Sequence, residues 1–153
     1  MTPGEIPAEV LLAGEAAGEI LKLERPISFW GGVDPESGRI TDPRHPQHDL
    51  SVAGRVLVIP ETIGSSSGSA VMLELISRRR APAAVILGKP DAILILGVVV
   101  AKEMEHDAPP PVLLLPVEDQ TRLVTGRACR IAAGGRIEMA APDGAPSRPG
   151  NSG

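Results

Sequence analysis

Three short, almost purely aliphatic runs limit what this chain can fold into. They read RVLVIP (residues 55–60), AAVILG (83–88) and PVLLLP (111–116), and each ends at a proline or a glycine. Apolar runs of this length, bounded by turn residues, are typical of buried strands. Two longer segments with helical character separate them. The middle of the chain therefore predicts the order strand, helix, strand, helix, strand.

The two intervening segments predict helices of different kinds. Between Ser69 and Arg79 the apolar residues share one face, which indicates an amphipathic helix. Ser69 is expected to cap its first turn, and the arginines at 78–80 suit its last turn. The second segment, AILILGVVVAKEM after Pro90-Asp91, is apolar on all sides and is therefore expected to be buried. Its periodicity also leaves a strand open.

Further strands are expected near both ends of the chain, at residues 10–12, 16–23, 122–125, 127–132 and 135–139. Together these elements predict one α/β domain over residues 8–140, with a mixed sheet or half-barrel and flanking helices. The segments 1–7 and 141–153 are rich in Pro, Gly and Ser and are expected to be disordered.

Composition argues against several classes of protein. Aromatic residues make up only 1% of the chain, so the core has to be built from Val, Ile, Leu and Ala. The net charge of −4 argues against a nucleic-acid partner. The longest apolar run, residues 92–101, is about half of what a membrane span requires. With no signal-peptide pattern and a single cysteine, Cys129, the chain is expected to be cytoplasmic, with no membrane partner.

The stretch IPETIGSSSGS (59–69) carries the strongest chemical signal. Gly64 and Gly68 allow backbone angles that let amide groups converge on one point, directly before a helix. Such amides and a helix N-terminus favour an anion, whether a carboxylate, a phosphate or a serine alkoxide. The loop therefore predicts a site for a small anion or an unusually acidic serine. A flexible Gly/Ser turn is the plain alternative.

Two common motifs fit this loop poorly. A phosphate-binding P-loop would end in Lys followed by Ser or Thr, and that ending is absent. GSSSG does match the nucleophile-elbow pattern Gly-x-Ser-x-Gly, with Ser66 in the middle. A hydrolase would then need a later histidine and an acid, and His106, in a polar segment, is the only later histidine.

Four blocks of the sequence carry a family resemblance: PISFWGGVDPESGRI, HPQHDLSVAGRVLVIP, GSSSGS and RRRAPAAVILGKPDAILILGVVVAKE. In order and spacing, over roughly residues 8–118, they resemble the small subunit of the aconitase X family. That domain is similar to the swivelling domain of aconitase, so the resemblance implies a swivelling-type α/β fold. It also implies a hydro-lyase, since some members are bacterial cis-3-hydroxy-L-proline dehydratases and others archaeal mevalonate 5-phosphate dehydratases.

The resemblance also implies a divided active site. The larger chain of the family carries the iron or iron–sulfur site, and this domain supplies a serine as proton acceptor. That serine is the first of the loop, here Ser65, with Gly64, Ser66 and Ser67 as substrate-binding residues. This chain is expected to hold no metal or cluster alone, because Cys129 is its one cysteine. No Lys or Arg lies in the loop, so the positive charge near Ser65 is expected from the partner or its metal.

Several alternatives stay open at this stage. Mevalonate-phosphate members carry a lysine just before the serine loop, where this chain has Thr62 and Ile63, so a hydroxyproline-type acid is favoured as the substrate. Phosphomevalonate is the alternative substrate. A rival of another class is a non-catalytic, anion-binding regulatory subunit, and a third is a self-sufficient serine hydrolase.

The remaining candidates have plainer interpretations. Phe29 and Trp30 suit core or interface packing, with a cavity lining as the alternative. The turn that contains Asp34 is placed near the active cleft only by the resemblance. His45 and His48 lack further metal ligands nearby in the sequence, and Cys129 is expected to be a small core residue.

Overall fold

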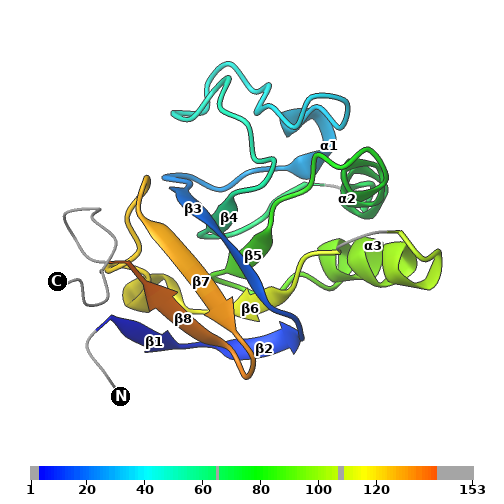
Figure 1. The fold of residues 1–153 in the computed structure, drawn as a ribbon. Helices are drawn as coiled ribbons and strands as arrows, with labels where there is room; N and C mark the ends of the chain where they lie inside the picture. Colours follow the sequence, from blue (N-terminus) through cyan, green and yellow to red (C-terminus); the bar gives the residue numbers. More distant parts are fainter. Residues whose placement is uncertain (1–3, 65, 107–108, 141–153) are drawn as a thin grey trace, which may run out of the picture.

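The computed structural model describes residues 4–64, 66–106 and 109–140, and a mixed sheet forms the body of this part of the chain (Figure 1). Its eight strands lie in the order β1-β8-β7-β3-β4-β5-β6-β2. Strands β3 to β6 run parallel and the other pairs are antiparallel. The strands are β1 (Glu5–Pro7), β2 (Glu9–Leu12), β3 (Ala16–Lys22), β4 (Val56–Ile59), β5 (Ala84–Leu87), β6 (Val112–Leu114), β7 (Ala128–Ala132) and β8 (Arg136–Met139).

The sheet curves until its two ends meet. Strands β1 and β2 occupy opposite ends of the strand order, yet only Ala8 separates them in the chain. β1 pairs with β8 and β2 with β6, and the Ala8 amide donates to the Gly135 carbonyl at 3.0 Å. One stretch of chain therefore closes the sheet into a barrel. The predicted mixed sheet is confirmed, and it closes further than the half-barrel that was the alternative. Residues 5–7 form a strand, so their predicted disorder is wrong, while residues 1–3 and 141–153, also predicted to be disordered, lie outside the described residues.

The side chains of the parallel strands point alternately to the two faces of the sheet, and this divides the core into two layers. Val56 and Val58 belong to a cluster inside the barrel, with Ile20, Ile86 and Ile131. Their neighbours Leu57 and Ile59 belong to a second cluster between the sheet and the helices. Because successive side chains of a strand point to opposite faces, strands buried on both sides read as continuous apolar runs.

Two helices cover the outer face of the parallel strands and pack against each other: α2 (Gly68–Ser77) and α3 (Ala92–Glu103) (Figure 1). Gly97 lies at their closest approach, because a Cβ there would stand 2.5 Å from the Ser69 carbonyl oxygen. Shorter elements are α1 (Phe29–Gly32), a single distorted turn, and the 3₁₀ turn η1 (Val117–Asp119). No helix in the described segments is long and apolar enough to cross a membrane.

The structure corrects four local predictions. The cap residue of α2 is Ser67, while the Ser69 hydroxyl donates to the Ser66 carbonyl at 3.2 Å. The arginines at 78–80 follow the last helical residue instead of forming the last turn. Residues 122–125 form turns, with Leu123 buried, instead of a strand.

The fourth correction concerns α3, which is not buried all round. Leu94, Val98 and Ala101 face the core, but Leu96 is 53% exposed and Ile93 38%. An all-apolar sequence does not by itself tell which faces other elements cover, so the helix was correctly predicted and its burial was not.

Candidate functional site

The serine loop lies at the carboxyl end of β4 and leads into α2. Ser65, the predicted proton acceptor, lies outside the described residues, so the structure bears on it only through its neighbours. Gly64 has a φ of +107°, in the region that favours glycine. A Cβ at Gly64 would overlap the Ser28 hydroxyl and lie 2.9 Å from the Ser28 Cβ. The chain before Ser65 therefore passes Ser28 at a distance that only glycine allows.

A short ladder holds the start of this loop beside the segment that contains SFWGG. Ile27 and Thr62 form a parallel bridge. The Ile63 amide donates to the Ile27 carbonyl at 2.9 Å, and the Ile27 amide donates to the Glu61 carbonyl at 3.3 Å. On the far side of the loop, Gly68 is buried with its Cβ position 3.9 Å from Phe29. Two of the most specific sequence blocks of the resemblance are thus neighbours in space.

The described serines take up distinct positions at the start of α2. Ser66 is exposed in the turn, and Ser67 is the cap residue, whose carbonyl accepts from the amides of Ala70 at 3.1 Å and Val71 at 3.2 Å. The first amides of any helix have no acceptor within the helix and carry the positive end of its dipole. This end of α2 is therefore suited to stabilising negative charge in the loop.

The N-terminus of α3 lies at the same edge of the sheet. Asp91 caps it by accepting from the amides of Ile93 at 2.9 Å and Leu94 at 3.1 Å, and the Thr62 hydroxyl donates to the other oxygen of Asp91. The carboxylate of Asp91 offsets the positive end of α3. Since α2 has no acidic residue in its first turn, the two helix ends differ in their electrostatics.

Lys89 is a charged residue of this edge that sequence reasoning missed. It lies two residues after the end of β5, and its ammonium lies 3.7 Å from the Glu61 carboxylate, which precedes the serine loop. Adjacent parallel strands end side by side, so the residue after β5 is a spatial neighbour of the residues after β4. The sequence alone does not give the strand order, so it could not predict that Lys89 lies beside the serine loop.

A hollow of about 500 Å³ lies between α2 and the segment that follows SFW. Its lining includes Trp30, Thr41, Ala70 and the two acidic residues Asp34 and Glu74. Trp30 is 60% exposed, while its neighbour Phe29 is buried, so of the two predicted packing residues only Phe29 belongs to the core.

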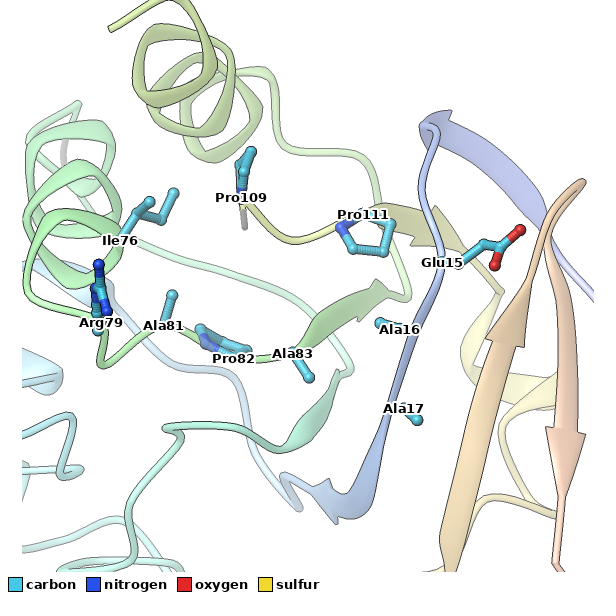
Figure 2. A pocket seen from close by; sticks show the side chains of 10 residues that line it. All are labelled: Glu15, Ala16, Ala17, Ile76, Arg79, Ala81, Pro82, Ala83, Pro109 and Pro111. Carbon is cyan, nitrogen blue, oxygen red and sulfur yellow. The ribbon is translucent and has the colours of Figure 1, made fainter. Parts of the chain in front are cut away.

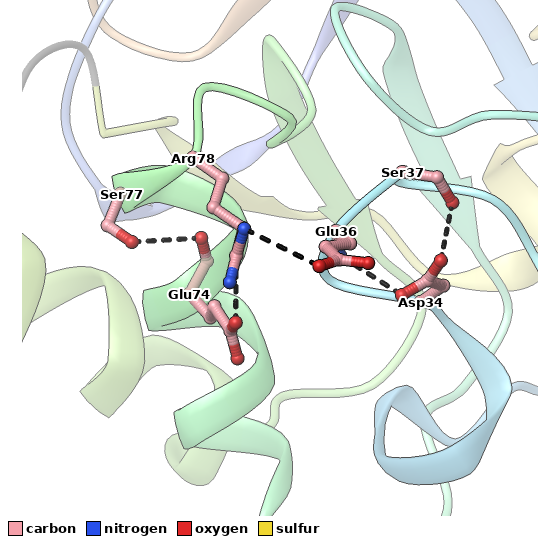
Figure 3. Close-up of polar contacts among 6 residues, drawn as sticks. All are labelled: Asp34, Glu36, Ser37, Glu74, Ser77 and Arg78. Carbon is pink, nitrogen blue, oxygen red and sulfur yellow. Dashed lines mark hydrogen bonds and ion pairs between the residues drawn. The ribbon is translucent and has the colours of Figure 1, made fainter.

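Polar contacts join the segment that contains Asp34 to the end of α2, as Figure 3 shows. The Arg78 guanidinium donates to the Glu74 carboxylate at 2.8 Å and lies 4.0 Å from Glu36. Asp34 accepts from the Ser37 hydroxyl at 2.8 Å and from the Glu36 amide at 3.0 Å. These bonds, the one from Ser37 first, lower the pKa of Asp34. The turn that contains Asp34 is thereby joined to α2.

A second hollow, of about 470 Å³, is lined by the residues that Figure 2 labels. Ala83 and Pro111 on its wall directly precede β5 and β6, so it opens at the amino ends of the parallel strands. Its lining is mainly Ala and Pro, with Glu15 and Arg79 as the charged members. Its size is comparable to that of the first hollow, and the described residues that line the two hollows include none of the serine loop itself.

The other histidines and the cysteine have structural surroundings. His45 is buried, with Nε2 3.2 Å from the Arg25 carbonyl and Nδ1 accepting from the Gln47 amide at 3.0 Å. His48 lies 3.6 Å from Asp49. Among the residues whose placement is described, no three His, Cys, Asp or Glu side chains group to hold a metal. Cys129 is a free, buried core thiol, as predicted.

His106 is badly placed for a catalytic triad with the serine loop. It follows α3 at its C-terminal end, whereas the N-terminal end of α3 is bonded to Thr62. The 12 helical residues of α3 extend about 18 Å at 1.5 Å per residue. Among the described residues, His106 therefore lies beyond hydrogen-bond reach of Ser66, the middle residue of the Gly-x-Ser-x-Gly match.

The fold and this loop together define a class of domain: a closed mixed sheet with two helices on one face, presenting a serine loop where its parallel strands end. Residues 5–139 match the sequence profile of the aconitase X swivel domain, and the chain belongs to that family.

The relatives carry this domain either as a small part of a longer chain or as a separate small subunit. The cis-3-hydroxy-L-proline dehydratase of Pseudomonas aeruginosa is 50% identical over 99 residues, which cover 65% of this chain but only 17% of that protein. The phosphomevalonate dehydratase small subunit of Methanothermobacter thermautotrophicus is 38% identical over 115 residues, 75% of this chain and 88% of that one. The crystal structure of Thermococcus kodakaraensis aconitase X in its holo-form matches with a TM-score of 0.79 and 32% identity, over 92% of this chain and all of that chain.

Proposed function

We propose that this chain is the small subunit of an aconitase X-type hydro-lyase, active only together with a larger chain. The observation that carries the proposal is the 50% identity to a named dehydratase combined with a serine loop held at a helix N-terminus. Because this chain spans 17% of that relative, most of the enzyme has to come from elsewhere. A cytoplasmic location belongs to the proposal, and the free thiol of Cys129 suits a reducing compartment.

In the proposed reaction, Ser65 accepts a proton from the carbon next to the substrate carboxylate. The C–H bond breaks and its electron pair forms a C=C bond, while the C–O bond on the next carbon breaks and its electron pair leaves with the hydroxyl. That hydroxide takes up one proton to become water, so the proton removed from carbon and the hydroxyl together balance as one water. A serine is a weak base at its usual pKa, so its oxygen has to be stabilised as an alkoxide. The N-terminal end of α2 supports that role, since its amides and dipole favour a negative oxygen without any Lys or Arg in the loop.

An iron or iron–sulfur group, which the family resemblance implies, does not fit this chain. Its one cysteine lies in the barrel interior, and the described side chains include no cluster of three potential ligands. No step of the proposed chemistry is therefore assigned to such a group on this chain. The group belongs, in this proposal, to the larger chain.

We favour cis-3-hydroxy-L-proline over phosphomevalonate as the substrate. Lys89, the basic residue found next to the loop, is already paired with Glu61 at 3.7 Å. Among its described lining residues, the hollow beside α2 has the acidic Asp34 and Glu74 and no Lys or Arg that would pair with a phosphate. A proline ring carries a cationic secondary amine beside its carboxylate, so this surrounding is compatible with hydroxyproline.

Substituting Ser65 tests the catalytic role. In the assembled enzyme, Ser65→Ala is expected to reduce kcat by about 10²–10⁴-fold, the usual contribution of a positioned acid or base, while the two chains still assemble. Ser77→Ala is the matched control, because Ser77 is exposed in the last turn of α2 and its hydroxyl donates to the Glu74 carbonyl of the same helix. Turnover is measured with cis-3-hydroxy-L-proline and with phosphomevalonate.

The outcome separates the rival functions. If Ser65→Ala weakens ligand binding but leaves turnover intact, the chain is an anion-binding regulatory subunit. If the isolated chain is active and reacts with a serine-directed acylating probe, it is a hydrolase. Either result contradicts the lyase proposal.

A further inference from the structure

The segment that enters the serine loop is held both through its backbone and through a side chain. Ile27 and Thr62 form a parallel bridge, and the Ile63 amide donates to the Ile27 carbonyl at 2.9 Å. The Thr62 hydroxyl donates to the Asp91 carboxylate at 2.5 Å. Such a short distance is usual when a hydroxyl donates to a carboxylate. Thr62 is therefore fixed on two sides, two residues before Gly64.

Asp91 does more than cap α3. Its Oδ1 accepts from the amides of Ile93 at 2.9 Å and Leu94 at 3.1 Å, which is the ordinary role of an aspartate before a helix. That role needs only one oxygen, and a serine could fill it equally well. The second oxygen, Oδ2, accepts from Thr62, in the segment after β4. Capping alone does not account for this second contact.

The same helix also contacts the chain just after the serine loop. A Cβ at Gly97 would lie 2.5 Å from the Ser69 carbonyl oxygen and 3.1 Å from the Ser69 Cα, in the first turn of α2. Asp91 and Gly97 are six positions apart, which is about 9 Å along the axis of a helix. One rigid element, α3, thus contacts the chain on both sides of the serine loop, at Thr62 before it and at Ser69 after it.

We propose that Thr62 and Asp91 are positioning residues of the dehydratase, whose hydrogen bond fixes the chain entering the serine loop relative to the N-terminal end of α2. This inference rests on the proposed function. Helix amides stabilise an oxygen only at hydrogen-bond distance, and a displacement of about 1 Å can cost about 100-fold in rate. The bond restricts such a displacement because it ties the entry of the loop to α3, which packs against α2.

The role assigned to the two residues is indirect. The Thr62 hydroxyl donates to Asp91, so Thr62 is assigned no contact with the substrate. Both residues are only half-buried, so water can replace the partner that a substitution removes. The loss of the bond is therefore expected to change the stability of the domain little and the position of the loop more.

Substitutions at the two positions separate the hydrogen bond from the shape of the side chains. Thr62→Val keeps the shape and removes the donor, whereas Thr62→Ser keeps the donor. Asp91→Ser keeps a cap for α3 and removes the oxygen that accepts from Thr62. Thr125→Val is the matched control, because it removes a hydroxyl that accepts from the Lys22 amide at 2.9 Å, in the turn before β7.

Each variant is assembled with the larger aconitase X chain of the same genome, and kcat and KM are measured with cis-3-hydroxy-L-proline and with phosphomevalonate. We expect Thr62→Val and Asp91→Ser to lower kcat by about 10–100-fold, with KM changed by less than about threefold. Their Tm is expected to stay within about 4 °C of the wild type. Thr62→Ser and Thr125→Val are expected to behave like the wild type.

Two further measurements test the mechanism of the effect. Amide hydrogen exchange of residues 63–68 is expected to become about two- to tenfold faster in Thr62→Val, the effect of one hydrogen bond on a local opening. The double variant Thr62→Val/Asp91→Ser is expected to be no slower than the slower single variant, because both substitutions remove the same bond.

The results that contradict the inference differ from those that contradict the proposed function. If the wild type dehydrates either substrate but Thr62→Val keeps its kcat, the bond does not position the loop and the proposed function stands. If Thr62→Ser is as slow as Thr62→Val, or if the two single effects multiply in the double variant, the hydrogen bond is not the cause. If exchange becomes equally faster throughout the domain, the substitution loosens the whole fold, which also contradicts the inference. If the wild-type complex dehydrates neither substrate, the proposed function fails and the positioning role fails with it.

Discussion

Individual residues around the serine loop are constrained by the backbone of their neighbours. Gly64 has to accept a positive φ and leave space for Ser28, and Gly68 is buried against Phe29. The sequence indicates that glycine matters in this loop, because glycine permits such angles. Only the structure identifies Ser28, 36 positions away in the sequence, as the residue that a Gly64 side chain would meet.

At the same scale, Cys129 predicts a loss of stability at alkaline pH. Burial in the barrel raises the pKa of this thiol to about 11, whereas an unfolded cysteine titrates near pH 8.5. The folded thiol thus keeps a proton that the unfolded chain loses. Its contribution to stability is fully present below about pH 8.5 and is lost as the pH rises toward the folded pKa, by about 2–3 kcal/mol at pH 10.5.

Denaturant unfolding of the wild type and of Cys129→Ala at pH 7.5 and 10.5 checks this prediction. The alanine variant is expected to start lower, because it leaves a small cavity, but to lose less stability between the two pH values. If both proteins lose the same amount, the thiol is not held in its protonated form by burial.

Some secondary-structure elements could be predicted from their sequences and others could not. The three aliphatic runs became β4, β5 and β6, because strands covered on both faces leave a continuous apolar signal. The segment at 122–125 carries a similar but shorter signal, and it forms turns in which Leu123 alone is buried. The exposed face of α3 could not be anticipated, since composition does not tell which faces of a helix other elements of the fold cover.

The contact between α2 and α3 predicts a strong effect of a small substitution. Gly97→Ala would place a methyl group 2.5 Å from the Ser69 carbonyl and 3.2 Å from the Met72 Cβ. Alanine favours a helix by about 1 kcal/mol over glycine, but forcing two packed helices apart costs about 1–3 kcal/mol. We expect a net loss of stability and, because Ser69 lies in the first turn of α2, reduced turnover of the assembled enzyme.

Thermal unfolding and kcat measurements check the Gly97→Ala prediction. Val99→Ala, on the exposed side of the same helix, is the control and is expected to change the stability by less than about 1 kcal/mol. A Gly97→Ala protein more stable than the wild type would show that α3 can move away from α2 freely.

For the whole molecule, closure of the sheet by β1 and β2 is the decisive feature. Ile6, 6% exposed, belongs to the inner core cluster, and β1 pairs with β8. At Gly135 a Cβ would lie 2.5 Å from the Ala8 carbonyl, so the β7–β8 turn presses on the junction of the two strands. The N-terminal strand is therefore part of the domain.

Ile6→Ala is accordingly expected to destabilise the domain by about 2–4 kcal/mol, as for other large-to-small changes in a core. The equally N-terminal Val10→Ala is expected to cost less than about 1 kcal/mol, because Val10 is 37% exposed. Urea unfolding followed by circular dichroism gives both values. Similar small effects for both variants would mean that the first strand does not close the barrel in solution.

The sequence by itself determined the strand–helix alternation, the buried aliphatic strands and the position of a serine loop before a helix, because these depend on local periodicity and on backbone freedom. It also carried the blocks that identify the family. Only the tertiary structure decided that residues 5–7 close the sheet, that Lys89 and Ser28 lie beside the loop, and that the outer face of α3 stays exposed. Each of these depends on strand order and packing between distant segments, and no local pattern encodes such contacts.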